Sequence, residues 1–423
     1  MTQTLPSSLP QWLAYIEQQH PANIALGLER VREVASAMGL DKPARRTIVV
    51  AGTNGKGSTV AFIEAIARAN GMRVGCYTSP HLEQFNERVR IDGEQAGDQA
   101  LVEAFAAVEA ARGEVALTYF EYATLAALWL FGRSNLDLAV LEVGMGGRLD
   151  AVNIIDADVS VITTVDLDHQ AFLGDDRETI GAEKAGIIRG WKPVVCGEID
   201  PPSSVLRRAY LVGANALRFG SDFFAEVIDE QRWRWRDVSL RLELPRPALD
   251  GPAQLANAAS AIAALRALDV RIARAAWAEG VAAARNPGRM ERFDRDGVQV
   301  LVDVGHNPHA ARAVAAALKA APVTGRTIAV LGMLADKDAA GVVAALEAQV
   351  DDWQLVGLSG ERGRSAETLA ADLGDVLPRG ATLSADPLAG LQHVLQAAAP
   401  GDRVVVLGSF HTVTAVRHWL QAG

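Results

Sequence analysis

Residues 47–58 read TIVVAGTNGKGS, and this stretch decides the fold. The apolar residues up to Ala51 predict a buried strand, and a glycine-rich loop with one lysine follows directly. Apolar residues then recur at helical spacing until Gly71, and RVGCYT resembles a second strand. Strand, loop, helix and strand in succession form the repeating unit of a parallel α/β sheet.

The loop at residues 52–58 predicts a phosphate-binding site. Backbone amides at a helix N-terminus attract phosphates, glycines allow close approach, and Lys56 adds a mobile cation. The match to G-x-x-x-x-G-K-[ST] is imperfect, because Val50 stands at the first glycine position and Gly57 separates Lys56 from Ser58. Ser58 is therefore a weak metal-ligand candidate. A plain glycine-rich turn is the alternative, but the flanking strand and helix favour phosphate binding.

Further apolar runs ending near Val143, Val165 and Cys196 predict buried parallel strands. In such sheets ligands bind just outside the carboxyl ends of the strands, so the residues that follow each run are site candidates. Alternating apolar residues between Phe219 and Leu244 predict a small antiparallel appendage.

A second, smaller α/β domain is expected after the breaker Asn286-Pro287-Gly288. Five short strand candidates alternate there with helical segments: VQVLVDV, TIAVLG, WQLVGL, ATLS and RVVVLG. We expect one domain over residues 1–286 and another over residues 287–423.

Composition limits the function classes. The 423 residues carry 41 basic and 51 acidic side chains, a net charge of −10 with no basic run, so a nucleic-acid or anionic-membrane surface is not expected. Two cysteines are too few for a disulfide framework. The longest apolar stretch, Tyr122 to Phe131, is about half of the ~20 residues that a membrane helix needs. Because no secretory signal is recognisable either, we expect a cytoplasmic protein.

Three strand ends carry candidate metal ligands: Ser79 in TSPH, Glu142 in LDLAVLEV and His169 in DLDHQAFLG. A phosphate loop usually works with Mg²⁺, which prefers hard oxygen donors. Each residue also has an ordinary alternative. Ser79 could cap a turn, Glu142 could pair with Arg148, and His169 could be a structural histidine.

Other polar residues have no clear role from spacing alone. Lys184 lies on a mostly apolar helical segment, where a lysine usually extends to solvent. Asn257, Arg289 and Asp303 could contact a nucleotide, but spacing alone slightly favours surface ion pairing and helix capping. The run at residues 144–147, GMGG, lacks the third glycine and the helix of a dinucleotide site, so we expect no nicotinamide or flavin.

Taken together, the motifs resemble the folylpolyglutamate synthase/dihydrofolate synthase family of the Mur ligase superfamily. The resemblance is collinear from about Leu26 to His411 and rests on GTNGKGST, TSPH, LEVGMGGRLDAVN, DHQAFLG, AEKAGI, NPGR, DVGHNPHA and GSFHTV. It implies a P-loop ATPase domain of the Mur ligase central type that also binds the pterin, followed by a Rossmann-like glutamate ligase domain.

The resemblance also implies the site residues. ATP would be held by Thr53, Asn54, Gly55, Lys56, Gly57, Ser58, Asn257, Arg289 and Asp303, and Mg²⁺ by Ser79, Glu142 and His169. Lys56, His169 and Lys184, the last carbamylated in many members, would act in catalysis, and His306 is a further candidate. The pterin would contact Ile24, Ala25, Leu26, Thr118, Tyr119, Phe120, Glu121, Leu149, Asp150 and Ala151. Two positions depart from the family pattern, Val304-Gly305 and Ala25.

The implied activity is ATP-dependent joining of L-glutamate to 7,8-dihydropteroate and to reduced folates. The version RLDAVN around Asp150 favours a bifunctional enzyme. We expect a monomer that uses ATP and Mg²⁺, with a monovalent cation such as K⁺ as a further candidate, and no nucleic-acid or membrane partner. The alternatives are polyglutamylation alone, a cell-wall Mur ligase, which would normally carry an extra domain before the loop, and a nucleotide-dependent regulatory switch.

Overall fold

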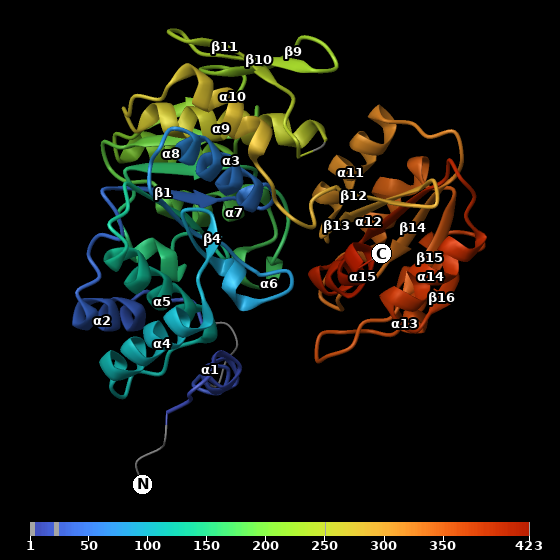
Figure 1. The fold of residues 1–423 in the computed structure, drawn as a ribbon, viewed down its shortest axis with the longest axis horizontal. Helices are drawn as coiled ribbons and strands as arrows, with labels where there is room; N and C mark the ends of the chain where they lie inside the picture. Colours follow the sequence, from blue (N-terminus) through green and yellow to red (C-terminus); the bar gives the residue numbers. More distant parts are fainter. Residues whose placement is uncertain (1–4, 21–24, 250, 423) are drawn as a thin grey trace. The chain divides into compact units, whose positions relative to one another are not determined.

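A computed structural model describes residues 5–20, 25–249 and 251–422 (Figure 1). The chain divides into two compact units. The first contains residues up to Ala248 together with Leu255–Arg285, and the second contains Leu249–Gln254 together with residues from Asn286 onward. The short segment 249–254 therefore belongs to the second unit, although it lies within the sequence of the first.

The first unit is built on a sheet of eight strands in the order β4-β3-β2-β5-β1-β6-β7-β8. Strands β2, β5, β1, β6 and β7 run parallel, as the apolar runs predicted, and β8 is a further parallel strand that the sequence interpretation missed, whereas β3 and β4 are antiparallel. The bounds are β1 Arg46–Ala51, β2 Val74–Tyr77, β3 Val89–Ile91, β4 Glu94–Gln95, β5 Leu138–Glu142, β6 Val159–Ile162, β7 Pro193–Cys196 and β8 Asn215–Arg218.

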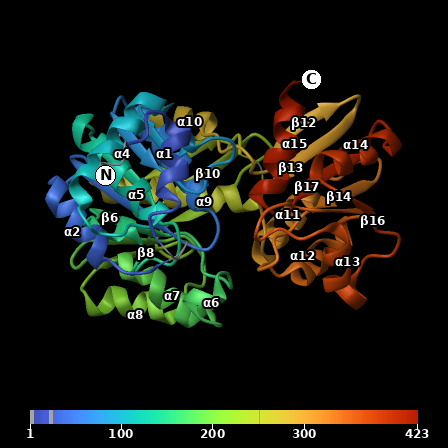
Figure 2. The same cartoon turned by 90° about the horizontal axis from the view of Figure 1, so that it is seen from below.

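Helices cover both faces of this sheet. One face packs into a core shared by α1, α2, α4, α5, α7 and α8, and α3 packs between the sheet and α10 (Figures 1 and 2). The bounds are α1 Leu9–Ile16, α2 Glu29–Met38, α3 Lys56–Ala69, α4 Asp98–Arg112, α5 Tyr119–Arg133, α6 Gln170–Leu173, α7 Arg177–Lys184, α8 Ser203–Leu211, α9 Pro252–Ala267 and α10 Arg274–Ala283. None of the described helices is long and apolar enough to cross a membrane.

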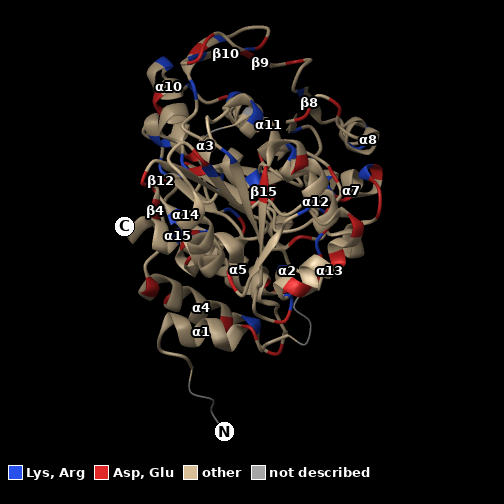
Figure 3. Ribbon diagram, turned by 90° about the vertical axis from the view of Figure 1, so that its right-hand side faces the viewer, with Lys and Arg blue, Asp and Glu red and all other residues tan. Residues whose placement is uncertain are grey.

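The predicted antiparallel appendage is confirmed as a three-stranded sheet of β9 Phe224–Val227, β10 Arg232–Arg236 and β11 Arg241–Pro245. Trp233 and Trp235 of β10 are fully buried, and the Trp235 indole N–H donates to the carbonyl of Ala259 on α9 at 3.1 Å. Arg234 and Arg236, which alternate with the tryptophans, pair with the acidic residues Glu226 and Glu243, and Figure 3 shows basic and acidic residues similarly interspersed along the chain.

The second unit is a sheet in the order β12-β13-β17-β14-β15-β16, parallel except for β12. All five predicted strands are present, and β12 is an additional edge strand that the sequence interpretation missed. The strands are β12 Glu291–Arg295, β13 Val298–Asp303, β14 Thr327–Leu331, β15 Asp352–Val356, β16 Thr382–Ser384 and β17 Arg403–Leu407. The helices are α11 Pro308–Ala320, α12 Ala339–Leu346, α13 Ala366–Leu373, α14 Pro387–Ala397 and α15 Phe410–Ala422.

Candidate active site

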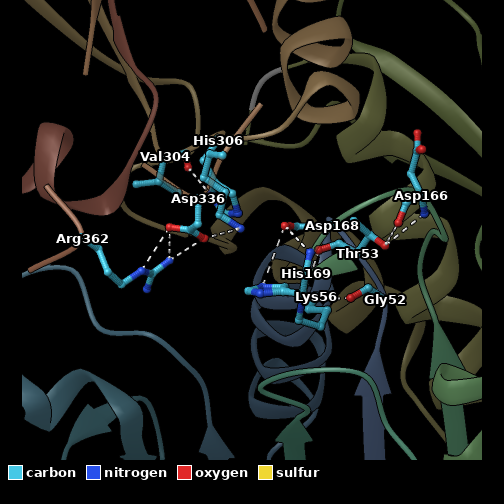
Figure 4. Close-up of polar contacts among 11 residues, drawn as sticks. Gly52, Thr53, Lys56, Asp166, Asp168, His169, Val304, His306, Asp336 and Arg362 are labelled. Atoms are coloured by element: carbon cyan, nitrogen blue, oxygen red, sulfur yellow. Dashed lines mark hydrogen bonds and ion pairs between the residues drawn. The ribbon is translucent and has the colours of Figure 1, made fainter. Parts of the chain in front are cut away.

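The phosphate loop lies between β1 and α3. Gly55 precedes the first turn of the helix with a φ angle of 87°, which favours glycine. Lys56 begins α3, and its Nζ donates to the carbonyl oxygens of Gly52 at 2.9 Å and Thr53 at 3.2 Å (Figure 4). The ammonium group therefore lies over the loop, at the helix end whose backbone amides attract anions.

The segment that follows β6 holds this loop in shape. The Thr53 N–H donates to the carbonyl of Thr164 at 2.7 Å. The Thr53 hydroxyl donates to the carbonyl of Asp166 at 2.9 Å and accepts from the Asp166 N–H at 3.0 Å (Figure 4). The Thr163 hydroxyl donates to the carbonyl of Asn54 at 2.6 Å. Two loops at the carboxyl edge of neighbouring strands are thus joined into one wall.

Asn257 reaches the same loop from α9. Its side chain is buried, and a Cβ atom added to Gly55 would lie 2.4 Å from its Oδ1 atom. Asn257 is neither on the surface nor at a helix end, so the capping alternative is wrong. The packing of α9 brings it to the phosphate loop.

Ser79 and Glu142 are neighbours, because they follow the paired strands β2 and β5. The Ser79 N–H donates to Glu142 Oε2 at 3.2 Å, and Glu142 is only 5 % exposed. The alternative in which Glu142 pairs with Arg148 is wrong, because Arg148 pairs with Glu183 at 2.8 Å. The hydroxyl of Ser79 and the carboxylate of Glu142 are oxygen donors that suit Mg²⁺.

His169 lies on a different loop and takes a left-handed backbone conformation, with φ of 52°. Its N–H donates to Asp168 Oδ1 at 2.8 Å, and its Nε2 atom is 4.0 Å from the same oxygen (Figure 4). Among the described residues no group of three or more His, Cys, Asp or Glu side chains is close enough to hold a metal by itself. The hydrogen bonds join Ser79 to Glu142 and His169 to Asp168.

Lys184 ends α7 and is 3 % exposed, so the expectation of a solvent-exposed lysine is wrong. Burial, and to a smaller extent the charge of Lys56, lowers its pKa to about 7, while Asp168 and Asp150 act in the opposite direction. A Cβ atom on Gly147 would lie 2.8 Å from the Lys184 carbonyl oxygen, which places the GMGG loop against this helix end. The side chain of Lys184 is therefore a buried amine that is uncharged in a fraction of the molecules at neutral pH.

Asp150 lies at the end of the GMGG loop. Its carboxylate accepts from the N–H groups of Met145 at 2.9 Å and Val152 at 3.0 Å. Burial raises its pKa to about 6, against these hydrogen bonds and the charge of Lys56. Asp150, Lys56 and Lys184 therefore belong to one electrostatic group.

The expected pterin residues fall into two sets, and Ile24 lies outside the described residues. Thr118 and Glu121 are buried and form the capping box of α5, in which the Thr118 N–H donates to Glu121 Oε2 at 2.8 Å. Glu121 also pairs with Arg30 at 2.9 Å, and Arg30 donates to the carbonyl of Ala25 at 2.9 Å. These side chains fix the position of the helix and of the chain before α2.

The other set has accessible surface. Tyr119, Phe120, Leu149 and Leu26 are half-buried, whereas Ala151 is buried. Phe120 lies 5.9 Å from the Tyr77 ring, and a Cβ atom on Gly144 would meet it at 2.7 Å. Phe120 therefore packs against both the GMGG loop and Tyr77.

The candidates of the second unit gather where β13 ends. Burial raises the pKa of Asp303, while nearby Arg289 and the N–H groups of Gly305 and Met290 lower it. His306 Nδ1 lies 3.1 Å from the Val304 carbonyl (Figure 4). The Arg289 guanidinium lies 5.8 Å from the Phe410 ring centroid.

The sequence interpretation missed several residues at these loops, namely Arg30, Thr163, Thr164 and Asp168. Asp168 and the two threonines directly follow β6, so the strand-end rule that selected His169 could have selected them as well. Arg30 carries no such signal, because its partner Glu121 is distant in the sequence.

Comparison with known proteins identifies the family of this chain. Residues 50–265 match the family model of the Mur ligase middle domain, and residues 288–410 match that of the Mur ligase glutamate ligase domain. A dihydrofolate synthase/folylpolyglutamate synthase of Escherichia coli is 46 % identical over 98 % of this chain and 96 % of its own length. The Haemophilus influenzae protein of the same name is 41 % identical over 96 % of both chains.

Solved structures give the same result. The Escherichia coli protein in complex with DHPP and ADP superposes with a TM-score of 0.93 at 45 % identity, covering 98 % of both chains. A bifunctional folylpolyglutamate synthase/dihydrofolate synthase with Mn, AMPPNP and L-glutamate bound has a TM-score of 0.92 at 43 % identity over the full length of both chains. This chain therefore belongs to the dihydrofolate synthase/folylpolyglutamate synthase family of the Mur ligase superfamily.

Proposed function

We propose that this chain is an ATP-dependent ligase that joins L-glutamate to 7,8-dihydropteroate and to reduced folates. The observation that carries the proposal is the phosphate loop, in which Lys56, Gly55 and Asn257 meet beside the buried Asp150 and Lys184. Relatives over 40 % identical carry both activities in their names, and solved relatives were obtained with ADP or AMPPNP and with L-glutamate.

A free carboxylate is a poor acyl donor, so the first step is its activation. A carboxylate oxygen of the pteroate or folate attacks the γ-phosphorus of ATP, the bond to the β,γ-bridging oxygen breaks, and ADP leaves. The products are ADP and an acyl phosphate. The protein contributes positive charge, and Lys56 with the amides of α3 would stabilise the charge on the phosphoryl oxygens.

In the second step the amine nitrogen of L-glutamate attacks the acyl carbon. The carbon–oxygen bond to phosphate breaks, phosphate carries away the electron pair, and the amine loses a proton as the amide forms. Water would destroy the intermediate, so the buried surroundings of Lys184 and Asp150 favour amide formation over hydrolysis.

Ser79, Glu142 and His169 would hold Mg²⁺, which neutralises phosphate charge when bound. Lys184 would be carbamylated, because CO₂ reacts with an uncharged amine and burial lowers the pKa of this lysine to about 7. Intact-protein mass spectrometry under CO₂ tests this: the mass of one CO₂ should be added to the wild type and not to Lys184→Met. Equal masses for the two proteins, after correction for the substitution, contradict the carbamate.

The remaining residues have proposed roles of the same kind. Tyr119, Phe120, Leu26, Leu149 and Ala151 would contact the pterin, and Arg289, Asp303 and His306 of the second unit would contact ATP or serve the ligase step. We assign ATP and pterin binding to residues 1–286 and the glutamate ligase role to residues 287–423. Cytoplasmic location, a monomeric state and the absence of nucleic-acid partners stay predictions.

One assay tests the proposal. Phosphate release from ATP and Mg²⁺ is measured alone, with dihydropteroate plus L-glutamate, and with tetrahydrofolate plus L-glutamate. Release that needs both partners in each pair supports the bifunctional ligase. Phosphate release that increases with tetrahydrofolate plus L-glutamate but not with dihydropteroate plus L-glutamate identifies polyglutamylation only. Phosphate release that neither substrate pair changes rejects the ligase in favour of a nucleotide switch. A cell-wall substrate in place of the folates tests the Mur ligase alternative.

A further inference from the structure

Arg177 and Glu198 together bind the backbone of one residue, Val165, at both its N–H and its carbonyl. The Arg177 Nε atom donates to the Val165 carbonyl at 2.8 Å, and the Val165 N–H donates to Glu198 Oε1 at 3.0 Å. Arg177 Nη2 completes the arrangement by donating to Glu198 Oε2 at 3.1 Å and to the Asp200 carbonyl at 2.9 Å. Both polar groups of the Val165 backbone are thus bound by a single ion pair.

Val165 links the Arg177–Glu198 ion pair to the phosphate loop. It follows β6, and the next residue, Asp166, exchanges two hydrogen bonds with Thr53 of the phosphate loop. Asp168 and His169 follow on the same segment. A displacement of the Val165 backbone would therefore move both Thr53 and the loop that carries His169.

The two charged residues come from different elements. Arg177 is the first residue of α7, the helix that ends with Lys184, and Glu198 follows β7. Burial raises the pKa of Glu198 to about 7, whereas the Arg177 cation and the Val165 N–H lower it. Arg177 therefore offsets part of the effect of burial and favours the charged form of this carboxylate.

We propose that Arg177 and Glu198 are positioning residues for the Mg²⁺–nucleotide site, acting through the Val165 backbone on Thr53 and on the loop of His169. The proposal rests on the proposed function only in that the phosphate loop binds a nucleotide. If the ion pair only stabilised the fold, its loss would lower the free energy of unfolding by about 0–1 kcal/mol and leave the affinity for ADP unchanged.

The Arg266–Asp237 pair offers a matched control. Its atoms are 3.0 Å apart, its side chains are 35 % and 18 % exposed against 42 % and 18 % for Arg177 and Glu198, and Asp237 also accepts backbone N–H groups. It lies beside the antiparallel appendage of the same unit. Its loss should cost similar stability without moving the phosphate loop.

The experiment measures the Kd of ADP with Mg²⁺ by calorimetry and the free energy of unfolding by urea for Arg177→Ala, Glu198→Ala, the double variant and Arg266→Ala. We expect about tenfold weaker ADP binding for each single variant at the Val165 backbone, little further loss in the double variant, and wild-type affinity for Arg266→Ala. Glu198→Gln, which keeps an acceptor for the Val165 N–H, should lose less than Glu198→Ala. In turnover, the KM for ATP should rise while the KM for L-glutamate stays unchanged.

Wild-type ADP affinity in Arg177→Ala and Glu198→Ala overturns the proposal, as does a loss equal to that in Arg266→Ala. If Arg177→Ala does not fold, Arg177→Lys and Glu198→Gln replace the alanine variants and should also bind ADP more weakly than the wild type. Lysine lacks the planar group with which arginine binds Val165, Glu198 and Asp200 together. A wild-type protein that binds ADP but forms no amide would reject the proposed function and leave this proposal standing.

Discussion

At the scale of single residues, Lys56 is the side chain whose loss should remove most activity. Its ammonium group donates to the loop carbonyls of Gly52 and Thr53, and we expect Lys56→Ala to fold. We expect kcat to fall at least about a hundredfold, comparable to the loss of a single group that stabilises transition-state charge.

The check is steady-state phosphate release, with circular dichroism to establish folding. Lys192→Ala is the control, because Lys192 pairs with Asp158 at 3.1 Å and takes no part in the candidate site. Near-normal turnover in a folded Lys56→Ala protein would contradict the assigned role.

Lys184 makes stability depend on pH in a direction that follows from its lowered pKa. The unfolded chain keeps the proton up to about 10.5, whereas the folded chain releases it at about 7. Between these values the unfolded state binds more protons, so the contribution of Lys184 to stability increases as the pH rises from about 7 toward 10.5. Below pH 7 both states are protonated and folding bears the full cost of the buried charge.

Urea unfolding in CO₂-free buffer measures this effect. The wild type should gain stability relative to Lys184→Met between pH 7 and 10, while Asp150, Asp168 and Lys56 remain present in both proteins. Parallel curves for the two proteins would show that the lysine is not buried as a neutral amine.

At the scale of elements, the start of α3 requires glycine at position 55 for two reasons. Its φ of 87° disfavours any other residue, and an added Cβ would lie 2.4 Å from Asn257 Oδ1. Gly55→Ala should therefore weaken ADP binding and lower the free energy of unfolding by roughly 1–3 kcal/mol.

The double variant Gly55→Ala/Asn257→Ala separates the two causes. It should recover the part of the stability lost to the clash but not the part lost to the backbone strain. Calorimetry and urea unfolding give both quantities. A Gly55→Ala protein as stable as the wild type would contradict the geometry of the loop.

The sequence allowed the central elements to be predicted because each buried strand is an apolar run that ends in glycine or polar residues. The hairpin of β3 and β4 was missed because its strands have three and two residues and carry charges. Asp92-Gly93, both at positive φ, is a recognisable hairpin turn and could have revealed it. The strand β12, ERFDR, was missed for a similar reason, since an edge strand need not be apolar.

The residues of the candidate site also divide into those that the sequence indicated and those that it did not. Lys56, Ser79, Glu142 and His169 were found because the carboxyl ends of parallel strands share an edge. The burial of Lys184 and the approach of Asn257 to Gly55 depend on how α7 and α9 pack, and no spacing in the sequence records that packing. The sequence interpretation missed Arg177 and Glu198 because their approach to Val165 also depends on packing.

At the scale of the whole molecule, the two units have separate hydrophobic cores, so unfolding should not be a single two-state transition. Scanning calorimetry should resolve two transitions. ADP with Mg²⁺ at about a hundred times its Kd should raise the midpoint of the first unit by roughly 5–10 °C. Lys56→Ala should abolish the increase, and an unmoved midpoint in the wild type would contradict nucleotide binding there.

The discontinuity of the first unit has a consequence for synthesis on the ribosome. Helix α10 packs on α3, where Gly280 lies so close to Ile66 that an added Cβ would be 2.3 Å from its Cα atom. When residue 248 emerges, the nascent chain has every strand of the larger sheet but lacks the helix that shields α3. The segment 249–254, which belongs with the later unit, emerges before that cover arrives. The growing polypeptide must therefore keep an apolar flank exposed to chaperones until residue 283 has left the exit tunnel.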